Sequence, residues 1–377
     1  MKIVVAPDSF KECLTAKQVA GHIAAGIRQV VPEAGINCIP VADGGEGTVE
    51  ALVEATGGSI LEVESVDALL RPLSTCIGIS GDKSTAFYRM AAASGLGMIK
   101  PLERNPLNTS SLGTGILLKH ALDLGFTNII LGIGGSATND GGMGMATALG
   151  YRFLDKHKKP VNQGGGNLKN IIWIETDNAH PLLAKANIQV ACDVNNPLCG
   201  NNGASAVFGP QKGATPPMVK ELDDNLLYFA QIIKEQLGKN VKDIPGAGAA
   251  GGLGAGLLAF SEAMLQPGFE IVKNLTRLEK FIEEADFVFT AEGKIDFQTQ
   301  FGKTPFGVAQ IAKKHDKPVI AFAGNIGKGA EILLENGITS YFSITNKPLT
   351  VEESILKAGE LLEETTQQVM RLIRQIF

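Results

Sequence analysis

KIVVAPDSF, residues 2–10, begins with a short run rich in β-branched residues (Lys2–Ala6) and ends in a polar turn. A helical pattern follows over Ala16–Val31, a second short apolar run over Cys38–Ala42, and a second helical pattern over Thr48–Thr56. This alternation of strand and helix is typical of a parallel sheet with helices on its faces. The first residues of the chain therefore predict an α/β fold with a parallel, Rossmann-like sheet.

The C-terminal part of the chain repeats the same alternation. Its predicted strands are Asp286–Thr290, Pro318–Ala323 and Ser340–Ile344, and its predicted helices are Phe306–His315, Gly329–Asn336 and a last one from Val351 to about Ile373. Neither terminal part supplies enough strands for a sheet of about five, but together they do. We therefore expect residues 1–74 and 285–377 to form one discontinuous domain.

The middle of the chain, residues 75–284, differs from both ends in composition. It is rich in Gly, Asn and Ala, has longer connections, and contains short predicted strands such as Asn128–Leu131 and Asn187–Ala191. We expect an inserted, glycine-rich second α/β domain here. The active site is expected in the cleft between the two domains.

Composition excludes several classes of protein. The chain has 377 residues, which suggests about two domains, and its net charge is −5 with no long run of Lys or Arg. A nucleic-acid partner is therefore not expected. No apolar run approaches the roughly 18 residues that cross a membrane, and the first apolar run is too short for a signal peptide, so a cytoplasmic location is expected. The five cysteines and five histidines show no metal-binding spacing, and the oligomeric state, a homo-oligomer included, stays open.

Polar or glycine-rich segments follow five of the predicted strands. In an open parallel sheet, ligands bind beyond the carboxyl ends of the strands. An acidic residue after a strand also commonly caps a helix, but its recurrence at several strand ends favours a ligand site. The candidate residues are Asp8, Ser9 and Lys11; Asp43, Gly44, Gly45 and Glu46; Gly134, Gly135, Ser136, Asn139 and Asp140; Asp193 and Asn195; and Glu292.

This set of residues suits phosphoryl transfer. That reaction needs backbone N–H groups around phosphates, carboxylates for Mg²⁺, cations for the developing charge, and a base for the attacking hydroxyl. Glycine-rich turns that open helices can supply the N–H groups, and residues 132–142 and 246–256 are the two candidates. Gly302-Lys303-Thr304 matches the end of a P-loop, but Phe297 stands where the first glycine of that motif belongs, so a standard P-loop is absent.

A second interpretation comes from the first glycine-rich run. Gly132–Ala137 fits the loose dinucleotide fingerprint G-x-G-x-x-A, and Asp155 follows about 20 residues later. An NAD-dependent hydroxyacid dehydrogenase is therefore an alternative. The acidic residues near Asp43 and Asp193, which hydride transfer does not need, argue against it. A non-catalytic sugar-acid-binding protein is a third possibility.

Several longer stretches carry a resemblance to a known family. They are APDSFK (6–11), ADGGEGT (42–48), GIGGSATNDGGMGM (132–145), CDVNNPLCG (192–200), FGPQKGA (208–214), GAAGGLGAGLLAF (248–260) and EGKIDFQTQFGKTPFGVA (292–309). With these in order, the chain resembles the bacterial glycerate kinase family (type 1) along nearly its whole length. Glu12 departs from the small residue, usually Gly, expected after APDSFK.

The resemblance implies an ATP-dependent kinase that phosphorylates (R)-glycerate to 2- or 3-phosphoglycerate with release of ADP, and Mg²⁺ as the metal. It also implies that the discontinuous domain is flavodoxin-like and that the inserted domain is smaller. Asp8, Asp43, Asp193 and Asp296 form the pool for the general base and Mg²⁺ ligation, with Asp43 and Asp193 as the expected metal ligands. Lys11 and Lys303 are the expected cations for phosphates or substrate carboxylate.

Overall fold

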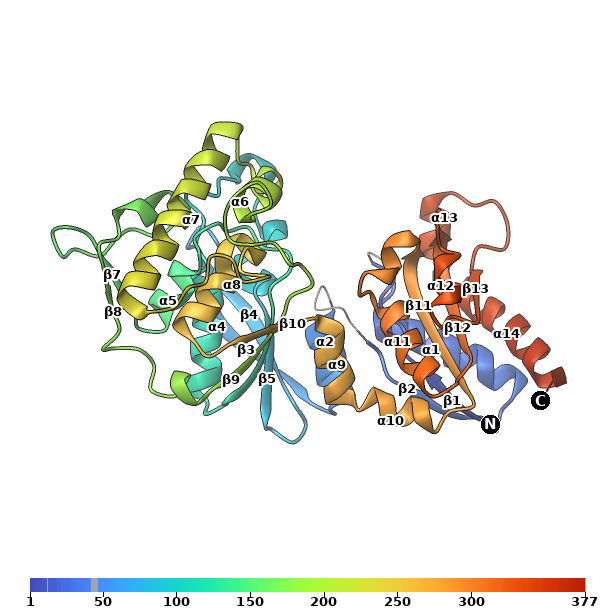
Figure 1. The fold of residues 1–377 in the computed structure, drawn as a ribbon. Coiled ribbons are helices and arrows are strands. Elements are labelled where there is room, and N and C mark those ends of the chain that lie inside the picture. Colours follow the sequence, from blue (N-terminus) through green and yellow to red (C-terminus); the bar gives the residue numbers. More distant parts are fainter. Residues whose placement is uncertain (12, 42–46, 377) are drawn as a thin grey trace. The chain divides into compact units, whose positions relative to one another are not determined.

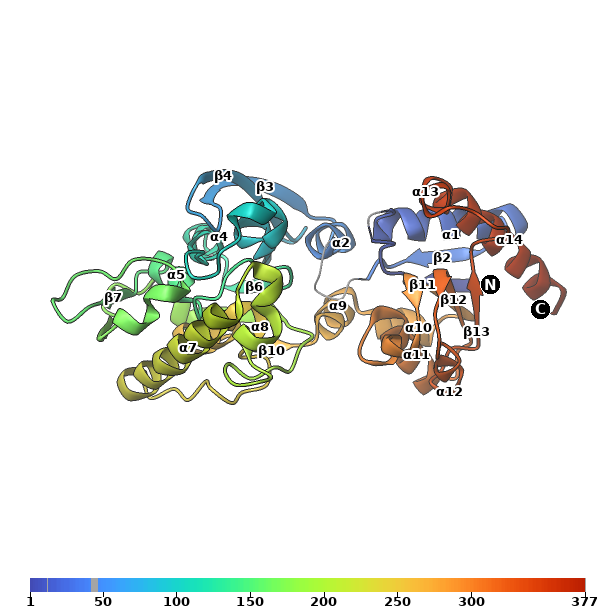
Figure 2. The same ribbon diagram turned by 90° about the horizontal axis from the view of Figure 1, so that it is seen from above.

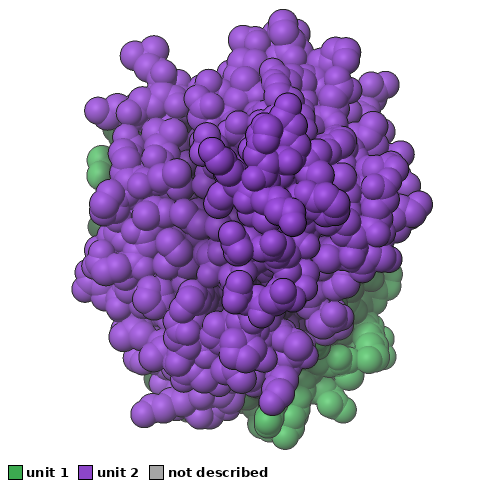
Figure 3. Space-filling model, turned by 90° about the vertical axis from the view of Figure 1, so that its left-hand side faces the viewer, with its two compact units in different colours: residues 1–55, 269–377 green, residues 56–268 purple. Residues whose placement is uncertain are grey.

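The computed structural model describes residues 1–11, 13–41 and 47–376. The chain divides into two compact units, unit 1 with residues 1–55 and 269–377, and unit 2 with residues 56–268 (Figure 3). Unit 1 is discontinuous, and its limits differ from the expected domain limits at residues 1–74 and 285–377. The inserted unit is also the larger of the two, not the smaller.

Unit 1 contains a five-stranded parallel sheet (Figure 1). Its strands are β1 (Lys2–Val5), β2 (Gly35–Cys38), β11 (Phe287–Ile295), β12 (Val319–Ile326) and β13 (Ser340–Ser343), in the spatial order β13-β12-β11-β1-β2. Every pairing between neighbours is parallel. Numbered in chain order, the strands lie 2-1-3-4-5, which is the flavodoxin-like order. The predicted α/β class with a parallel sheet is therefore confirmed.

Unit 1 also contains eight α-helices in its described residues, several of which cover the two faces of this sheet. They are α1 (Ala16–Val30), α2 (Thr48–Ala55), α9 (Gly268–Thr276), α10 (Leu278–Glu283), α11 (Thr304–Lys314), α12 (Ile332–Glu335), α13 (Val351–Leu356) and α14 (Ala358–Ile376). α1 and α14 lie on one face and α10, α11 and α12 on the other (Figure 2). α1 and α14 approach closely at Gly26, where a Cβ would lie 2.7 Å from the carbonyl oxygen of Glu363. Apolar side chains of both helices, such as Ile23 and Leu362, complete the core against the sheet.

The predicted strand Cys38–Ala42 is wrong, because β2 ends at Cys38. Beyond it, Ile39 and Val41 still donate their N–H groups to Val5 (2.8 Å) and Pro7 (2.9 Å) carbonyls of the neighbouring segment. Pro40 stands between them and faces the open edge of the sheet, where its missing N–H costs no hydrogen bond to the β1 segment. The predicted last helix is likewise divided, with α13 ending at Leu356 and α14 beginning at Ala358.

Unit 2 is built on a six-stranded mixed sheet. Its strands are β3 (Ser59–Val66), β4 (Pro72–Ile79), β5 (Thr85–Arg89), β6 (Asn128–Gly132), β9 (Asn187–Ala191) and β10 (Met264–Gln266), in the order β10-β9-β6-β5-β4-β3. β3, β4 and β5 pair antiparallel, whereas β5, β6, β9 and β10 run parallel. A unit boundary at residue 74 would cut β4 and break its eight-residue pairing with β3.

The remaining elements of unit 2 pack around this sheet. Its helices are α3 (Ala91–Ser94), α4 (Leu112–Asp123), α5 (Met143–Ala148), α6 (Ala204–Phe208), α7 (Pro216–Leu237) and α8 (Ala249–Phe260), and β7 (Arg152–Leu154) pairs with β8 (Trp173–Glu175). Phe153, Phe229 and Phe260 contact one another at the centre of the apolar core. Across both units, none of the helices in the described ranges has the length and apolar character needed to span a membrane.

Candidate active site

The strand order of unit 1 places a topological switch point between β1 and β11. In such sheets the connections from the two central strands leave in opposite directions, and ligands bind outside the carboxyl ends at that point. Seven polar residues gather there from three segments, and we call them the switch-point cluster. They are Asp8 and Ser9 after β1; Glu292, Lys294 and Asp296 at the end of β11; and Lys303 and Thr304 at the start of α11.

Asp8 lies at the centre of the switch-point cluster and is only 5% exposed. Its Oδ1 accepts hydrogen bonds from the backbone N–H (2.6 Å) and the hydroxyl (3.3 Å) of Ser9. Its Oδ2 accepts one from the Thr304 hydroxyl (2.8 Å), and its own N–H donates to the Ala291 carbonyl oxygen (2.8 Å). These contacts fix the orientation of the Asp8 carboxylate, as the work of a catalytic base or metal ligand requires.

Two lysines of the switch-point cluster are each paired with a carboxylate. Lys303 Nζ lies 2.8 Å from Glu292 Oε1, and Lys294 Nζ lies 2.7 Å from Asp296 Oδ2. The hydrogen bond from Lys294 is the main reason why the pKa of Asp296 lies below its ordinary value, so this carboxylate is ionised at neutral pH. The arrangement places two cations and three carboxylates at one end of a parallel sheet.

In unit 2, the loop after β6 encloses a buried carboxylate. Asp140 Oδ2 accepts hydrogen bonds from the Ser111 backbone N–H (2.8 Å), the Ser111 hydroxyl (2.9 Å) and the Gly144 N–H (3.2 Å), and Oδ1 accepts one from the Gly142 N–H (3.2 Å). Burial raises the pKa of Asp140, and the hydrogen bonds from Ser111 and the two glycines act against that rise. Because both oxygens bind groups of its own unit, Asp140 holds the loop in shape.

Lys212, which sequence reasoning did not single out, is a charged residue of a separate segment that contacts this loop. Its side chain is fully buried, and Nζ donates to the Ser136 hydroxyl and to the Thr138 carbonyl oxygen, both at 2.7 Å. Burial lowers the pKa of Lys212 to about 7, although the charge of Asp140 acts in the opposite direction. The only signal in the sequence was a lone lysine among small and apolar neighbours in FGPQKGA.

Two more polar groups of the loop are buried without a partner in the described residues. They are the side-chain NH₂ of Asn139 and the hydroxyl of Thr138, both on residues with no exposed surface. Asn139 Oδ1 accepts a hydrogen bond from the Ser205 hydroxyl (3.2 Å), which fixes the amide in one orientation. Unsatisfied buried donors are uncommon in folded proteins and often mark functional sites. We call residues 134–140 together with Lys212 the glycine loop.

The predicted residues of unit 2 fall into two neighbouring places. Gly134 and Gly135 are exposed directly after β6, and Gly135 has a left-handed φ of +75°. They do not open a helix, because α5 begins only at Met143. Asp193 and Asn195 are exposed after β9, which pairs with β6, and Asp193 Oδ1 accepts a hydrogen bond from the Gly268 N–H (3.0 Å).

The structure thus gathers Asp8, Ser9, Glu292, Asp296 and Lys303 in unit 1, and Ser136, Asn139 and Asp140 in unit 2. Lys11 is exposed on the turn that follows Phe10. The predicted residues Asp43, Gly44, Gly45 and Glu46 lie outside the described residues. Sequence reasoning missed Lys294, Thr304 and Lys212. Within the described part of the chain, no three His, Cys, Asp or Glu side chains lie close enough together to hold a metal ion.

Burial of Lys212 predicts a specific pH dependence of stability. Its pKa is about 7 in the folded chain and 10.5 in the unfolded chain, so the unfolded state binds more protons between these values. The unfolding free energy should therefore rise with pH across this window by up to about 3 to 5 kcal/mol. Denaturant titrations from pH 6.5 to 10 give the unfolding free energy of the wild type and of Lys212→Met, and the difference between the two isolates the contribution of Lys212. An equal dependence of the unfolding free energy on pH in both proteins would contradict this prediction.

A parallel α/β unit with a charged switch point, joined to a second unit with a polar glycine loop, is the architecture of a two-unit α/β enzyme. Residues 3–374 match the model of the glycerate kinase family. Among curated relatives, the chain is 51% identical to a glycerate kinase of Haemophilus influenzae, with 99% of both chains covered. It is 50% identical to a glycerate kinase of Halalkalibacterium halodurans, with 97% of both covered. A glycerate 2-kinase of Escherichia coli is 49% identical and covers 94% of this chain and 93% of its own.

A solved structure agrees with these relatives. The crystal structure of a Salmonella typhimurium LT2 protein proposed to be glycerate kinase 2 matches with a TM-score of 0.92 and 48% identity, over 100% of this chain and 98% of the other. The chain belongs to the glycerate kinase family. Membership of a kinase family implies a nucleotide substrate.

Proposed function

We propose that this chain transfers the γ-phosphoryl group of ATP to a hydroxyl of (R)-glycerate and releases ADP. The observation that carries the proposal is the switch-point cluster, in which two lysines, three carboxylates and the N-terminus of α11 meet at one end of the unit 1 sheet. Phosphoryl transfer depends mainly on positioning and on stabilising charge, and these side chains are of the types it uses.

In this proposal Lys303 is the principal phosphate-binding cation. It precedes Thr304, the first residue of α11, so its ammonium group and the helix N-terminus can act on the same anion. Its bond to Glu292 keeps it in place before the nucleotide arrives. Lys294, paired with Asp296, is the second cation, and Lys11 is a third candidate on the exposed turn.

Asp8 is the preferred candidate for the general base or for a ligand of Mg²⁺. The residues fit Mg²⁺ in the form in which it accompanies a nucleotide, where one or two carboxylates supplement phosphate oxygens and water. When bound, Mg²⁺ would neutralise part of the triphosphate charge. Asp193, and Asp43 outside the described residues, stay predicted ligands.

The glycine loop is proposed to bind the anionic or hydroxyl groups of glycerate. Ser136 is held by Lys212, Asn139 has an unpaired buried donor, and the exposed backbone of Gly134 and Gly135 is open to a ligand. Asn195 on the neighbouring strand end is a further candidate. Of the two hydroxyls of glycerate, O2 is favoured, because the Escherichia coli relative is a glycerate 2-kinase.

The dehydrogenase alternative loses its structural support. A dinucleotide fingerprint needs the helix to begin within the glycine turn, so that the helix N-terminus meets the pyrophosphate. Here α5 begins at Met143, after the fingerprint residues 132–137 have ended. Asp155 is engaged in a turn, where its Oδ1 accepts hydrogen bonds from the His157 (2.8 Å) and Lys159 (2.9 Å) N–H groups.

Thermal shift and turnover assays test the proposed function together. ATP with Mg²⁺ should raise the melting temperature, whereas NAD⁺ should not, because a ligand stabilises only the protein that binds it. ADP release should require glycerate. A shift with NAD⁺ alone would revive the dehydrogenase, and binding of glycerate without ADP release would favour the non-catalytic alternative. The cytoplasmic location and an active site between the two units stay predictions, and the oligomeric state stays open.

Replacement of Lys303 by Met should weaken binding of ATP, or of its transition state, by about 1 to 3 kcal/mol. This corresponds to a rise in KM for ATP, or a fall in kcat/KM, of roughly 5- to 150-fold. Lys314→Met is the matched control, because Lys314 lies at the opposite end of α11 and forms a similar pair with Glu279 (2.5 Å). Steady-state kinetics with both substrates measure the effect. Wild-type kinetics in Lys303→Met would remove this residue from the site.

A further inference from the structure

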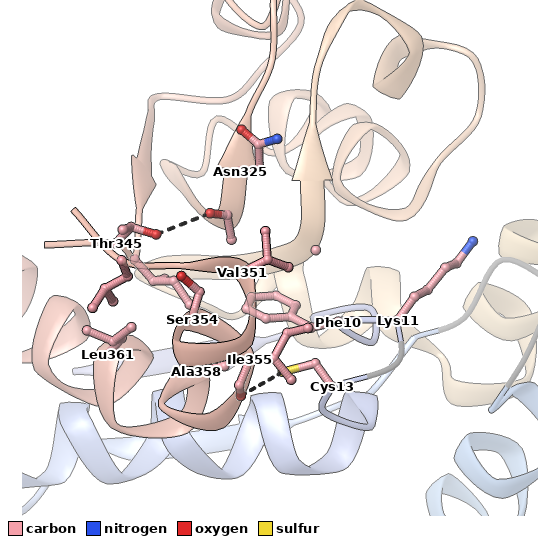
Figure 4. Close-up of a pocket in the computed structure, with 14 residues that line it drawn as sticks. Phe10, Lys11, Cys13, Asn325, Thr345, Val351, Ser354, Ile355, Ala358 and Leu361 are labelled. Carbon is pink, nitrogen blue, oxygen red and sulfur yellow. Dashed lines mark hydrogen bonds between the residues drawn. The ribbon is translucent and has the colours of Figure 1, made fainter. Parts of the chain in front are cut away.

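Unit 1 contains a pocket of about 330 Å³ (Figure 4). It lies at the carboxyl ends of three neighbouring segments. Gly293 of β11, Asn325 of β12 and Thr345 just after β13 contribute to it, together with the turn after β1 at Phe10 and Lys11. This is the edge of a parallel sheet at which ligands bind. No residue given a role in the proposed phosphoryl transfer lines it, apart from Lys11.

The inner walls of this pocket are apolar and buried. Phe10, Ile344 and Leu361 form buried walls with 4%, 3% and 5% exposure. The mouth is apolar as well, because Val351 and Ile355 of α13 line it while 71% and 42% exposed. A concave apolar surface of this kind, with a few polar groups, is typical of sites for flat organic ligands.

The polar groups of the pocket are placed to select such a ligand. The hydroxyls of Thr345 and Ser354 already donate to the Gly324 (3.4 Å) and Thr350 (2.9 Å) carbonyl oxygens. The side-chain amide of Asn325 makes no hydrogen bond to any other described residue, and it offers one donor group and one acceptor. An amide of this type matches the hydrogen-bonding edge of a purine, whose faces are apolar.

The pocket adjoins the switch-point cluster through the polypeptide backbone. Phe10 follows Ser9 directly, and Gly293 follows Glu292, so each pair of consecutive Cα atoms is about 3.8 Å apart. The two segments also contact each other, because a Cβ on Gly293 would lie 3.5 Å from Phe10 Cα. A ligand that fills the pocket can therefore extend across residues 8–11 and 293 to Lys303 and Lys294.

We infer that this pocket binds the purine base of the nucleoside triphosphate, while the triphosphate extends to the lysines of the switch-point cluster. This inference rests on the proposed function, since it assigns one part of the same substrate. The distribution of charge supports it. Among the described residues that line the pocket, Lys11 at the edge is the only Lys or Arg, whereas two lysines lie in the switch-point cluster. An uncharged base fits the first place and a triphosphate the second.

Ser354→Trp tests the inference by filling the pocket from α13. KM for ATP should rise at least about tenfold, and KM for glycerate should stay within about twofold of the wild-type value. Leu356→Trp is the matched control, because Leu356 lies on the same helix, is 84% exposed and does not line the pocket. It should keep both KM values. Val351→Trp, at the exposed mouth, replaces Ser354→Trp if that variant does not fold.

A binding measurement separates this inference from the proposed function. In the wild type, ATP should raise the melting temperature more than tripolyphosphate does, and Ser354→Trp should lose that difference while keeping the tripolyphosphate shift. If Ser354→Trp loses this difference and the wild type does not phosphorylate glycerate, the base-binding pocket is supported and the proposed function is rejected. If folded Ser354→Trp turns over normally, with an unchanged KM for ATP and an unchanged ATP shift, the pocket does not bind the base. The proposed function would be unaffected by that result.

Discussion

Asp8→Asn should lower kcat by about 100-fold or more while the protein stays folded. A carboxylate that acts as a base or metal ligand contributes about 10²- to 10⁴-fold to a rate, and an amide supplies neither a base nor a strong metal ligand. The substitution keeps the size of the side chain. One of the hydrogen bonds from Ser9 or Thr304 to the Asp8 carboxylate has to be exchanged, which costs about 1 kcal/mol and a few degrees of melting temperature.

Asp286→Asn is the control for this experiment. Asp286 stands at the amino end of β11, opposite the switch point, and its Oδ2 accepts a hydrogen bond from the Lys2 N–H (2.8 Å). Its replacement should affect stability slightly and kcat not at all. If folded Asp8→Asn turned over at the wild-type rate, Asp8 would be neither the general base nor a metal ligand, and Asp193 and Asp296 would become the leading candidates.

Lys212→Met should lower kcat/KM by roughly 10- to 100-fold, although Lys212 is too deeply buried to touch a substrate in this conformation. Its ammonium group joins Ser136 to the Thr138 carbonyl oxygen, and Met offers neither hydrogen bond. The glycine loop should then relax, and a shift of about 1 Å at a substrate-positioning residue can cost around 100-fold in rate. Lys212 is therefore a positioning residue.

Stability distinguishes this role from a merely structural one. Burial disfavours the charged form of Lys212, as its lowered pKa shows, and replacement by the apolar Met removes this unfavourable contribution. Lys212→Met should therefore melt at or above the wild-type temperature near pH 6.5 while being less active. The exposed Lys185 of unit 2, changed to Met, is the control and should alter neither property. A variant that is both unstable and fully active in its folded fraction would contradict the assignment.

The sequence was sufficient to predict the parallel sheet and several of the polar residues that the structure brings together at its switch point. β1, β11 and β12 coincide with β-branched or apolar runs, because strands buried on both faces need such residues throughout. The general rule for parallel sheets then placed Asp8 and Glu292 at strand ends, and the structure brings them together with Lys303 at the switch point. Strand order followed only from the family resemblance.

The rest depends on packing between distant parts of the chain. The hairpin of β3 and β4 belongs to the inserted unit because it pairs on through β5, and this continuation is not visible in the strands themselves. In the sequence, Lys212 resembles a surface lysine. Only the folded chain brings it to Ser136, 76 residues away, and buries it. The length of the loop between β6 and α5 was also needed to discount the dinucleotide fingerprint.

The most direct test of the central claim is the phosphorus NMR spectrum of the reaction products. Purified protein is incubated with ATP, Mg²⁺ and (R)-glycerate, with L-glycerate and no-acceptor reactions as controls. We predict one new phosphomonoester signal, equal in amount to the ADP formed and coinciding with authentic 2-phosphoglycerate. A signal of 3-phosphoglycerate would correct only the position of transfer. ADP accompanied by inorganic phosphate alone, or no consumption of ATP, would contradict the claim that this chain phosphorylates glycerate.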